Sequence, residues 1–340
     1  MKEIEAREFL AHKQAFPVLD TRSPAEYEQG HVPGAVSFPL FENTERETIG
    51  KLYKEKGKQA AISEGLRITG PKMADFIERA VAFDAQHFLV HCWRGGMRSQ
   101  SIAWLLELYG FSVWIMKGGY KAYRNSLLSY FEDPPPLRVL TGATGSMKTA
   151  MLKQLRLTGE QVVDLEALAN HQGSSFGNQL STGQPTTEQF QNDLFEAFLA
   201  LDPKKPVWIE DESFSIGRVH LIEPLYRNMQ LAPHYHLELP LEKRIDVLLR
   251  DYGQLSEDKL ITAIRGIARK LGVTNTGEAI ACVEEGELGK AAAIVLNYYD
   301  RAYRKGIQQK SDKVVEKFYL TGENLEETAQ LLINYGKRTH

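Results

Sequence analysis

Residues 87–99, HFLVHCWRGGMRS, contain an apolar run followed at once by a cysteine, two arginines and two glycines. The apolar run predicts a buried strand, and residues 101–110, SIAWLLELYG, predict a helix. Cys92 would then lie at the C-terminal tip of a strand, where ligands bind in α/β sheets. Successive backbone N–H groups, the helix dipole and Arg98 would favour an anion there and lower the pKa of the thiol. We therefore expect this loop to hold both a thiolate and an oxyanion.

Short apolar runs alternate with helical patterns from the start of the chain to about residue 130, as is typical of a parallel α/β sheet. The expected strands and helices are 16–20, 34–40, 87–92 and 111–119, and 23–29 and 73–83, respectively. Three consecutive prolines in residues 131–138 can neither continue a helix nor occupy a central strand. The sequence therefore predicts a first domain at residues 1–130 and a Pro-rich linker at 131–137.

A second α/β domain is predicted for residues 138–340. Its expected strands are 138–142, 162–166, 206–212 and 234–240. They are separated by helices such as residues 186–201, which again is the rhythm of a parallel sheet. From about Leu241 the pattern is amphipathic helix, interrupted by a candidate strand at 314–320, so we expect a helical subdomain beside the sheet.

Residues 142–149, GATGSMKT, follow one expected strand and open an expected helix, which is the context of a Walker A phosphate loop. Backbone N–H groups at a helix N-terminus can hold a diphosphate. The residue before the lysine is normally glycine and here is Met147, whose side chain makes a positive φ costly, so nucleotide hydrolysis is in doubt. The predicted phosphate-binding residues are Gly142, Thr144, Gly145, Ser146, Lys148 and Thr149.

Residues 207–212, VWIEDE, predict a buried strand that ends in acids, as a Walker B strand does. Thr149 and Asp211 are the candidate ligands of a Mg²⁺ ion there. An acidic strand end is also commonly just solvated, so the motif by itself is weak. We expect no tightly bound cofactor.

The bulk composition is that of an ordinary globular protein, with 43% hydrophobic and 25% charged residues. No apolar run approaches the roughly 20 residues of a membrane span, and the charged N-terminus does not resemble a secretory signal, so we expect a cytoplasmic protein without membrane contact. Two cysteines, Cys92 and Cys282, exclude a disulfide framework or a four-cysteine zinc site. The net charge of −3 neither requires nor excludes a nucleic-acid partner.

The spacing Cys-x5-Arg after a histidine occurs both in protein tyrosine phosphatases and in rhodaneses. Residues 19–27, LDTRSPAEY, and 30–35, GHVPGA, resemble the rhodanese domain, as does 116–120, MKGGY. Rhodaneses carry a chalcogen on the loop cysteine, because a polarisable thiolate can accept sulfur or selenium and pass it on. Asp20 and Arg22 are interpreted as a structural turn and ion pair at the strand end.

Two further stretches occur in the same order as these features: residues 164–177, DLEALANHQGSSFG, and 209–218, which begin IEDES and end IGR. Together they resemble the tRNA 2-selenouridine synthases over nearly the whole chain. The resemblance implies that wobble 2-thiouridine in tRNA is S-geranylated from geranyl diphosphate, and that the sulfur is then exchanged for selenium from selenophosphate. It implies Cys92 as the selenium carrier, as an S-selanylcysteine, with Arg94 and Arg98 stabilising the released phosphate.

The resemblance also implies partners, namely tRNA and the enzyme that produces selenophosphate. The candidate substrate contacts are Asp164, Asn170, His171, Ser174, Ser175, Glu210, Asp211 and Arg218. Basic residues at helical spacing give candidate tRNA contacts at Arg244, Arg250, Arg269, Lys270 and Arg304. Loop capping explains Asn170 and His171 equally well, and a solvated helix face explains the basic residues equally well.

Three other functions fit parts of the pattern. A sulfurtransferase fused to a small-molecule kinase would use Cys92 and a nucleotide on the phosphate loop, although Met147 counts against it. A phosphatase would use Cys92 and Arg98, although no general-acid aspartate can be assigned. An RNA-binding protein would keep the phosphate loop only as structure.

Overall fold

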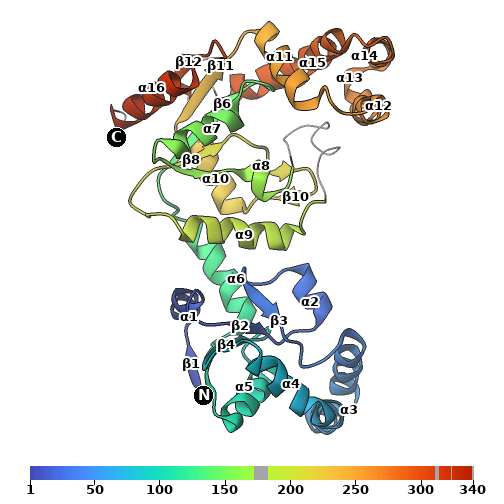
Figure 1. The fold of residues 1–340 in the computed structure, drawn as a ribbon, viewed down its shortest axis with the longest axis vertical. Coiled ribbons are helices and arrows are strands. Elements are labelled where there is room, and N and C mark those ends of the chain that lie inside the picture. The colour runs from blue at the N-terminus through green and yellow to red at the C-terminus, as the bar shows by residue number, and fades with distance from the viewer. Residues whose placement is uncertain (172–182, 311–313, 323, 339–340) are drawn as a thin grey trace. The chain divides into compact units, whose positions relative to one another are not determined.

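The computed structural model describes residues 1–171, 183–310, 314–322 and 324–338, with the side chains of 302–310 excepted. The chain separates into two compact units, Met1–Phe131 and Glu132–His340. Each unit has its own five-stranded parallel sheet, so the mixed α/β class expected from the sequence is confirmed (Figure 1).

The sheet of the first unit has the strand order β1-β5-β4-β2-β3. Its strands are β1 (Lys2–Ile4), β2 (Val18–Asp20), β3 (Ala35–Ser37), β4 (His87–His91) and β5 (Ser112–Met116). Its helices are α1 (Ala6–His12), α2 (Pro24–Gln29), α3 (Asn43–Thr69), the 3₁₀ turn η1 (Gly70–Lys72), α4 (Met73–Val81), α5 (Met97–Tyr109) and α6 (Gly119–Tyr130). Buried strands such as β4, with its run of apolar side chains, are what a parallel sheet covered on both faces requires.

The sheet of the second unit has the order β12-β11-β6-β8-β7. Its strands are β6 (Leu137–Gly142), β7 (Gln161–Val163), β8 (Val207–Glu210), β11 (His234–Glu238) and β12 (Val314–Tyr319). A small antiparallel hairpin, which the sequence did not predict, pairs β9 (Ser215–Ile216) with β10 (Val219–His220). Strand β6 pairs with β8 and β11 and thus lies in a different sheet from β4.

The helices of the second unit fall into two groups. Those beside the sheet are α7 (Lys148–Leu157), α8 (Leu165–Leu168), α9 (Thr187–Leu199), α10 (Glu223–Leu231) and α16 (Leu325–Arg338). Between β11 and β12 the chain forms α11 (Leu241–Tyr252), α12 (Glu257–Gly266), α13 (Ala268–Leu271), α14 (Val273–Glu284) and α15 (Leu288–Lys310). Helices α12 to α15 share an apolar core of their own, which includes Leu260, Ile264 and Val295. The helical part expected from about Leu241 therefore begins at the start of α11.

Candidate active sites

The thiol of Cys92 lies directly after β4 and before the first turn of α5, as the sequence predicted. Its side chain is almost fully buried. The Gly96 N–H donates to Sγ at 3.2 Å, and the Ser99 hydroxyl donates at 3.3 Å. Burial disfavours the thiolate, but donation from Ser99 and from loop N–H groups, together with the charge of Arg98, outweighs it and lowers the pKa of Cys92. The loop therefore stabilises a nucleophilic thiolate.

The segment between β5 and α6 holds this loop in shape. The N–H of Tyr120 donates to the Cys92 carbonyl at 2.8 Å, and the N–H of Lys121 donates to the Trp93 carbonyl at 3.0 Å. Gly119 has a φ of +59°, and a Cβ there would lie 2.5 Å from the Cys92 oxygen. Only glycine fits so close to the loop, which explains the second glycine of the MKGGY segment.

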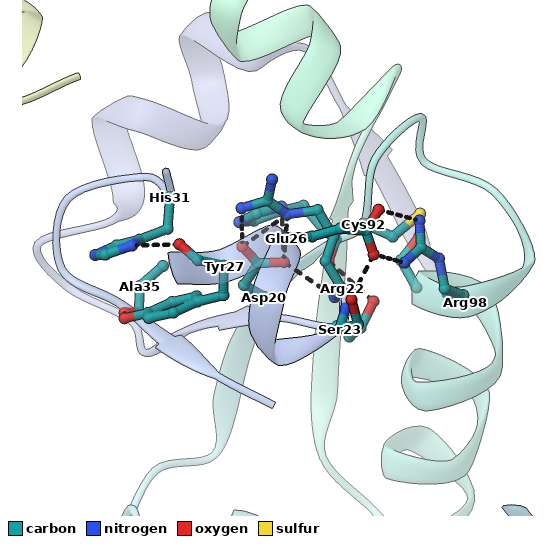
Figure 2. Close-up of polar contacts among 12 residues, drawn as sticks. Asp20, Arg22, Ser23, Glu26, Tyr27, His31, Ala35, Cys92 and Arg98 are labelled. Atoms are coloured by element: carbon teal, nitrogen blue, oxygen red, sulfur yellow. Dashed lines mark hydrogen bonds and ion pairs between the residues drawn. The ribbon is translucent and has the colours of Figure 1, made fainter. Parts of the chain in front are cut away.

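Arg98, which was expected to bind a phosphate, already pairs with a carboxylate from another element. Its guanidinium donates through Nη1 and Nη2 to both oxygens of Glu26 in α2 (Figure 2). Burial alone would raise the pKa of Glu26. The hydrogen bond and charge of Arg98 outweigh burial, so the pKa lies below its ordinary value. An oxyanion must therefore share Arg98 with Glu26, whereas Arg94 is exposed. Glu26 was not predicted as a site residue from the sequence, although Ser23 three residues earlier marks a capping box.

Asp20 and Arg22 form a fully buried ion pair, with Arg22 Nη2 2.6 Å from Asp20 Oδ2. Arg22 also donates to the Gly30 carbonyl at 2.7 Å and lies over the ring of Tyr120. Burial disfavours the Asp20 carboxylate, but the charge of His91 and the contacts with Arg22 lower its pKa. The pair fixes the end of β2 beside the thiol loop, which is the structural role expected for it.

The phosphate loop joins β6 to α7 in the manner of a Walker A motif. Met147, where glycine is usual, has a φ of +66° and caps α7 in the left-handed region. Its side chain is largely buried and belongs to the apolar core that contains Met151 and Leu152. The positive φ that the motif demands is thus kept, and its cost of roughly 1–3 kcal/mol is opposed by packing.

A pocket of about 500 Å³ lies over this loop. Its lining includes all six predicted phosphate-binding residues and also Lys153, Glu166, Asp211 and Arg250. Lys148 donates from Nζ to the Gly142 carbonyl at 2.9 Å, a contact that an incoming anion would replace. The loop, the lysine and the start of α7 therefore form a site for a phosphorylated ligand.

Three glutamates lie together beside the loop. Side-chain oxygens of Glu166, Glu210 and Glu212 fall within 4.8 Å of one another, and Thr149 donates to Glu166 at 3.3 Å. Glu210 is fully buried, and its Oε2 has no hydrogen-bond partner among the residues that the structure describes. Burial first, and then the neighbouring Glu166, raise the pKa of Glu212 to about 8. Asp211, the acid expected to hold a metal, instead accepts from Thr141 at 2.9 Å and lies outside this group.

We predict that this cluster makes the stability of the metal-free protein pH-dependent. Since the pKa of Glu212 rises from 4.5 to about 8 on folding, the folded state binds more protons between these values. The free energy of unfolding should therefore fall as pH rises from 6 to 8, by up to about 1.4 kcal/mol per pH unit. Urea unfolding at several pH values measures how the free energy of unfolding depends on pH. Glu212→Gln should flatten the slope, and an unchanged slope in that variant would exclude this residue as its source.

Helix α11 crosses directly over the phosphate loop, and Arg244 holds it there. The Arg244 guanidinium donates from Nε to the Thr144 carbonyl at 2.8 Å and pairs with Asp300 of α15 at 2.6 Å. Arg244 is buried. Its expected role as a tRNA contact is therefore corrected: spacing placed it on a solvated helix face, whereas the structure uses it to join the loop, α11 and α15.

We predict that Arg244→Ala lowers the free energy of unfolding by about 3 kcal/mol, because it leaves the Asp300 carboxylate without its buried partner. Arg250→Ala in the same helix is the control, since Arg250 is largely exposed and should matter by less than about 0.5 kcal/mol. Urea unfolding of both variants provides the comparison. If the Arg244→Ala protein were as stable as the wild type but bound tRNA weakly, Arg244 would be a tRNA contact, as the sequence predicted.

The remaining predicted contacts are partly brought together. Asp164 caps α8, accepting from the Ala167 N–H at 2.8 Å, and Asn170 donates to the Gly183 carbonyl at 2.6 Å. Gln184, which the sequence analysis missed, donates to the carbonyls of Ala169 and Ile216 and accepts from the Arg218 N–H. This glutamine thus joins the segments that end at His171 and surround Arg218. Ser174 and Ser175 lie outside the described residues.

The other candidate tRNA contacts are not gathered into one patch by any contact in the described part of the chain. Arg250 lines the phosphate pocket, and Arg269 and Lys270 belong to the short helix α13. Arg304 lies in α15, where its side chain is outside the described residues. Among the helices that the structure describes, none is long and apolar enough to cross a membrane.

These features define a two-unit α/β protein that combines a rhodanese-type thiolate loop with a Walker-type phosphate loop. Residues 5–126 match the rhodanese-like domain, and residues 135–330 match the tRNA 2-selenouridine synthase AAA domain. The chain belongs to the tRNA 2-selenouridine synthase family, and it is therefore a tRNA-modifying transferase.

Relatives of similar length support this assignment. A tRNA 2-selenouridine synthase from Shewanella woodyi is 34% identical, with 88% of this chain and 90% of the relative covered. One from Marinobacter nauticus is 35% identical with the same coverage.

Among solved structures, the N-terminal domain of a putative ATP/GTP binding protein from Clostridium difficile 630 is 37% identical and covers 37% of this chain and 99% of its own, with a TM-score of 0.34.

Proposed function

We propose that this protein converts wobble 2-thiouridine in tRNA to 2-selenouridine in two steps, S-geranylation and then exchange of sulfur for selenium. The observation that carries the proposal is the pairing of two separate anion-holding loops in one chain of this family, only one of which bears a thiolate. Each loop suits one step. The tRNA is the substrate of both steps. The enzyme that produces selenophosphate would supply that compound to this protein in the cytoplasm.

The first step belongs to the phosphate loop. The 2-thiouridine sulfur attacks C1 of geranyl diphosphate, a C–S bond forms, the C–O bond breaks, and the uridine loses its N3 proton. Lys148 and the loop N–H groups would stabilise the departing diphosphate, since they offer donors where negative charge develops. Met147 in place of glycine fits a loop that binds a diphosphate without hydrolysing a nucleotide.

An apolar slot next to this pocket supports a prenyl ligand. Leu248 and Tyr252 line both the phosphate pocket and the slot, whose other walls come from α12, α14 and α15. A geranyl tail is apolar throughout and suits such walls, whereas burial of a polar ribose among them would be costly. The slot measures about 40 Å³, room for only a few waters, so entry of the tail must widen it.

The glutamate cluster fits a Mg²⁺ ion, because its donors are carboxylate oxygens and one of them, Glu210 Oε2, is buried with no hydrogen-bond partner in the described part of the chain. Glu166, Glu210 and Glu212 would hold the ion beside Thr149. A bound Mg²⁺ supplies Lewis-acid stabilisation of diphosphate oxygens. Burial raises the pKa of Glu166, and the charge of Lys148 opposes this rise, so the lysine favours the ionised carboxylate that would hold the ion.

The second step belongs to the thiol loop. The Cys92 thiolate first exchanges with a small disulfide to form a mixed disulfide, and the selenium of selenophosphate then attacks the Cys92 sulfur as the small thiol leaves. Water takes the phosphoryl group from selenium, so a selenenyl sulfide remains on Cys92, while Arg94, Arg98 and the loop N–H groups hold the released phosphate. The selenium then attacks C2 of the S-geranyl nucleoside, the C2–S bond breaks and geranylthiol leaves with a proton. An added thiol attacks the Cys92 sulfur, which frees the selenouridine and restores the mixed disulfide for the next turnover.

Mass spectrometry of nucleosides tests the proposal. The protein is incubated with 2-thiouridine tRNA, geranyl diphosphate, selenophosphate, Mg²⁺ and a thiol together with its disulfide, and S-geranyl-2-thiouridine should appear before 2-selenouridine. ATP turnover without tRNA would instead favour the kinase fusion. Release of phosphate from a phosphotyrosine substrate would favour the phosphatase, and tRNA binding without any change in base mass would favour the RNA-binding protein.

A further inference from the structure

An apolar pocket of about 200 Å³ opens beside the thiol loop, within the first unit. It lies between α3 and the first turn of α5. Its apolar walls include Phe41, Ile49, Ala61, Ile62, Leu66 and Met97. Three cations, Arg46, Lys58 and Arg98, line it as well. No part of the mechanism described above uses this pocket.

The pocket adjoins the reactive thiol through Arg98. The same guanidinium that lines the pocket acts electrostatically on the Cys92 sulfur. Met97, next to it in the sequence, lines the pocket from the residue after Gly96, whose N–H donates to Sγ at 3.2 Å. A group that enters the pocket would therefore extend from a reacting atom placed at Cys92.

The chemistry of the thiol loop does not account for apolar walls. Selenophosphate is a small, charged, strongly hydrated anion, and it needs only the donors already present in the loop. The walls are nonetheless open to a ligand: Leu66 is 66% exposed and Met97 is 48% exposed. Apolar side chains that stay open around a concave site mark a site for an apolar ligand.

The charges around the pocket restrict further the class of ligand that it can bind. Arg46 and Arg98 both contact Glu26, so the single carboxylate faces two guanidinium groups, and Lys58 adds a third cation. These three cations would add nothing to the affinity for a free hydrocarbon. A hydrocarbon chain attached to a polyanion would gain from both parts of the site, and an RNA that carries a prenyl group is such a molecule.

We infer that this pocket receives the geranyl chain of the S-geranyl-2-thiouridine intermediate, while Arg46 and Lys58 meet phosphates next to the modified nucleotide. The chain held in the pocket would fix the thioether, and with it C2, against the selenium on Cys92. This inference rests on the proposed function and names the site that recognises its intermediate. Leu66 and Ala61 would be positioning residues for the second step.

The test supplies the intermediate directly. An anticodon stem-loop RNA with S-geranyl-2-thiouridine is compared with the same RNA carrying S-methyl-2-thiouridine, each with selenophosphate, a thiol and the disulfide of that thiol. Ala61→Trp fills the pocket, and Leu66→Gln changes an exposed wall. Leu108→Gln is the matched control, because Leu108 is 69% exposed in α5 and does not line the pocket.

The wild type should convert the S-geranyl RNA with a kcat/KM about tenfold above that for the S-methyl RNA. Both pocket variants should lose about tenfold on the S-geranyl RNA and little on the S-methyl RNA, with geranylation of unmodified 2-thiouridine RNA and selenium loading of Cys92 unchanged. Leu108→Gln should match the wild type. Pocket variants that keep the preference for the S-geranyl RNA would overturn the inference, whereas a wild type that converts neither RNA would overturn the proposed function itself.

Discussion

A Cys92→Ser protein, supplied with 2-thiouridine tRNA, geranyl diphosphate and selenophosphate, should accumulate the S-geranyl nucleoside and lose about a hundredfold or more in 2-selenouridine formation. A serine hydroxyl can accept the hydrogen bonds from Gly96 and Ser99 that now reach Sγ, so the loop should keep its shape. The hydroxyl stays neutral near pH 7 and cannot carry selenium as the thiolate does. Nucleoside mass spectrometry measures both products.

Cys282→Ser is the control for this variant, since Cys282 is the second cysteine of the chain and lies in α14. It should behave as the wild type in both steps. Selenouridine made by Cys92→Ser at the wild-type rate would mean that selenide reaches C2 without a covalent carrier. Loss of geranylation in the same variant would mean that the two steps share one site.

The second large effect is expected for Lys148→Ala, which should reduce geranylation about a hundredfold or more while the fold persists. Lys148 lines the phosphate pocket, and within the described part of the chain its ammonium donates to the Gly142 carbonyl. Its loss removes charge stabilisation of the departing diphosphate but little packing. Titration of geranyl diphosphate by calorimetry, together with the yield of S-geranyl product, provides the measurement.

Lys205→Ala is a suitable control, because the Lys205 side chain is exposed on the loop before β8 and its ammonium forms a long ion pair with Asp202. Presented with S-geranyl RNA, the Lys148→Ala protein should still form selenouridine, since the thiol loop is intact. Unchanged affinity for geranyl diphosphate together with an unchanged yield would remove Lys148 from the site.

Except for β1, the strands of both sheets could be predicted because they are short apolar runs at regular intervals, and β4, β5, β6, β8 and β11 lie where those runs occur. The long helix α3 could not, since its 27 residues bury only Ala61 and Gly65 and it is interrupted at Gly57, which has a φ of +84°. A helix without a clear apolar stripe leaves no period for sequence analysis to detect. Strand β1 was also missed, being three residues at the sheet edge.

The positions of Cys92 and the phosphate loop were predicted because each motif is contiguous in sequence. Glu26, Glu166 and Gln184 were missed as site residues because their contacts depend on how distant elements meet. Glu166 becomes part of an acid cluster only when α8 lies beside the end of β8, where its N–H donates to Glu210 at 2.8 Å. Arg244 shows the opposite error: helical spacing cannot tell an exposed cation from one paired with a partner 56 residues away.

The anchoring of Met147 in the core bears on how the phosphate loop meets its ligand. A glycine at this position would leave the backbone free to sample many shapes, and ligand binding would have to restrict them. Here the buried thioether side chain fastens the loop to α7 and to the sheet during folding. Conformational entropy is thus lost when the chain folds and not when the diphosphate arrives, so the cradle stands preorganised before any encounter with substrate.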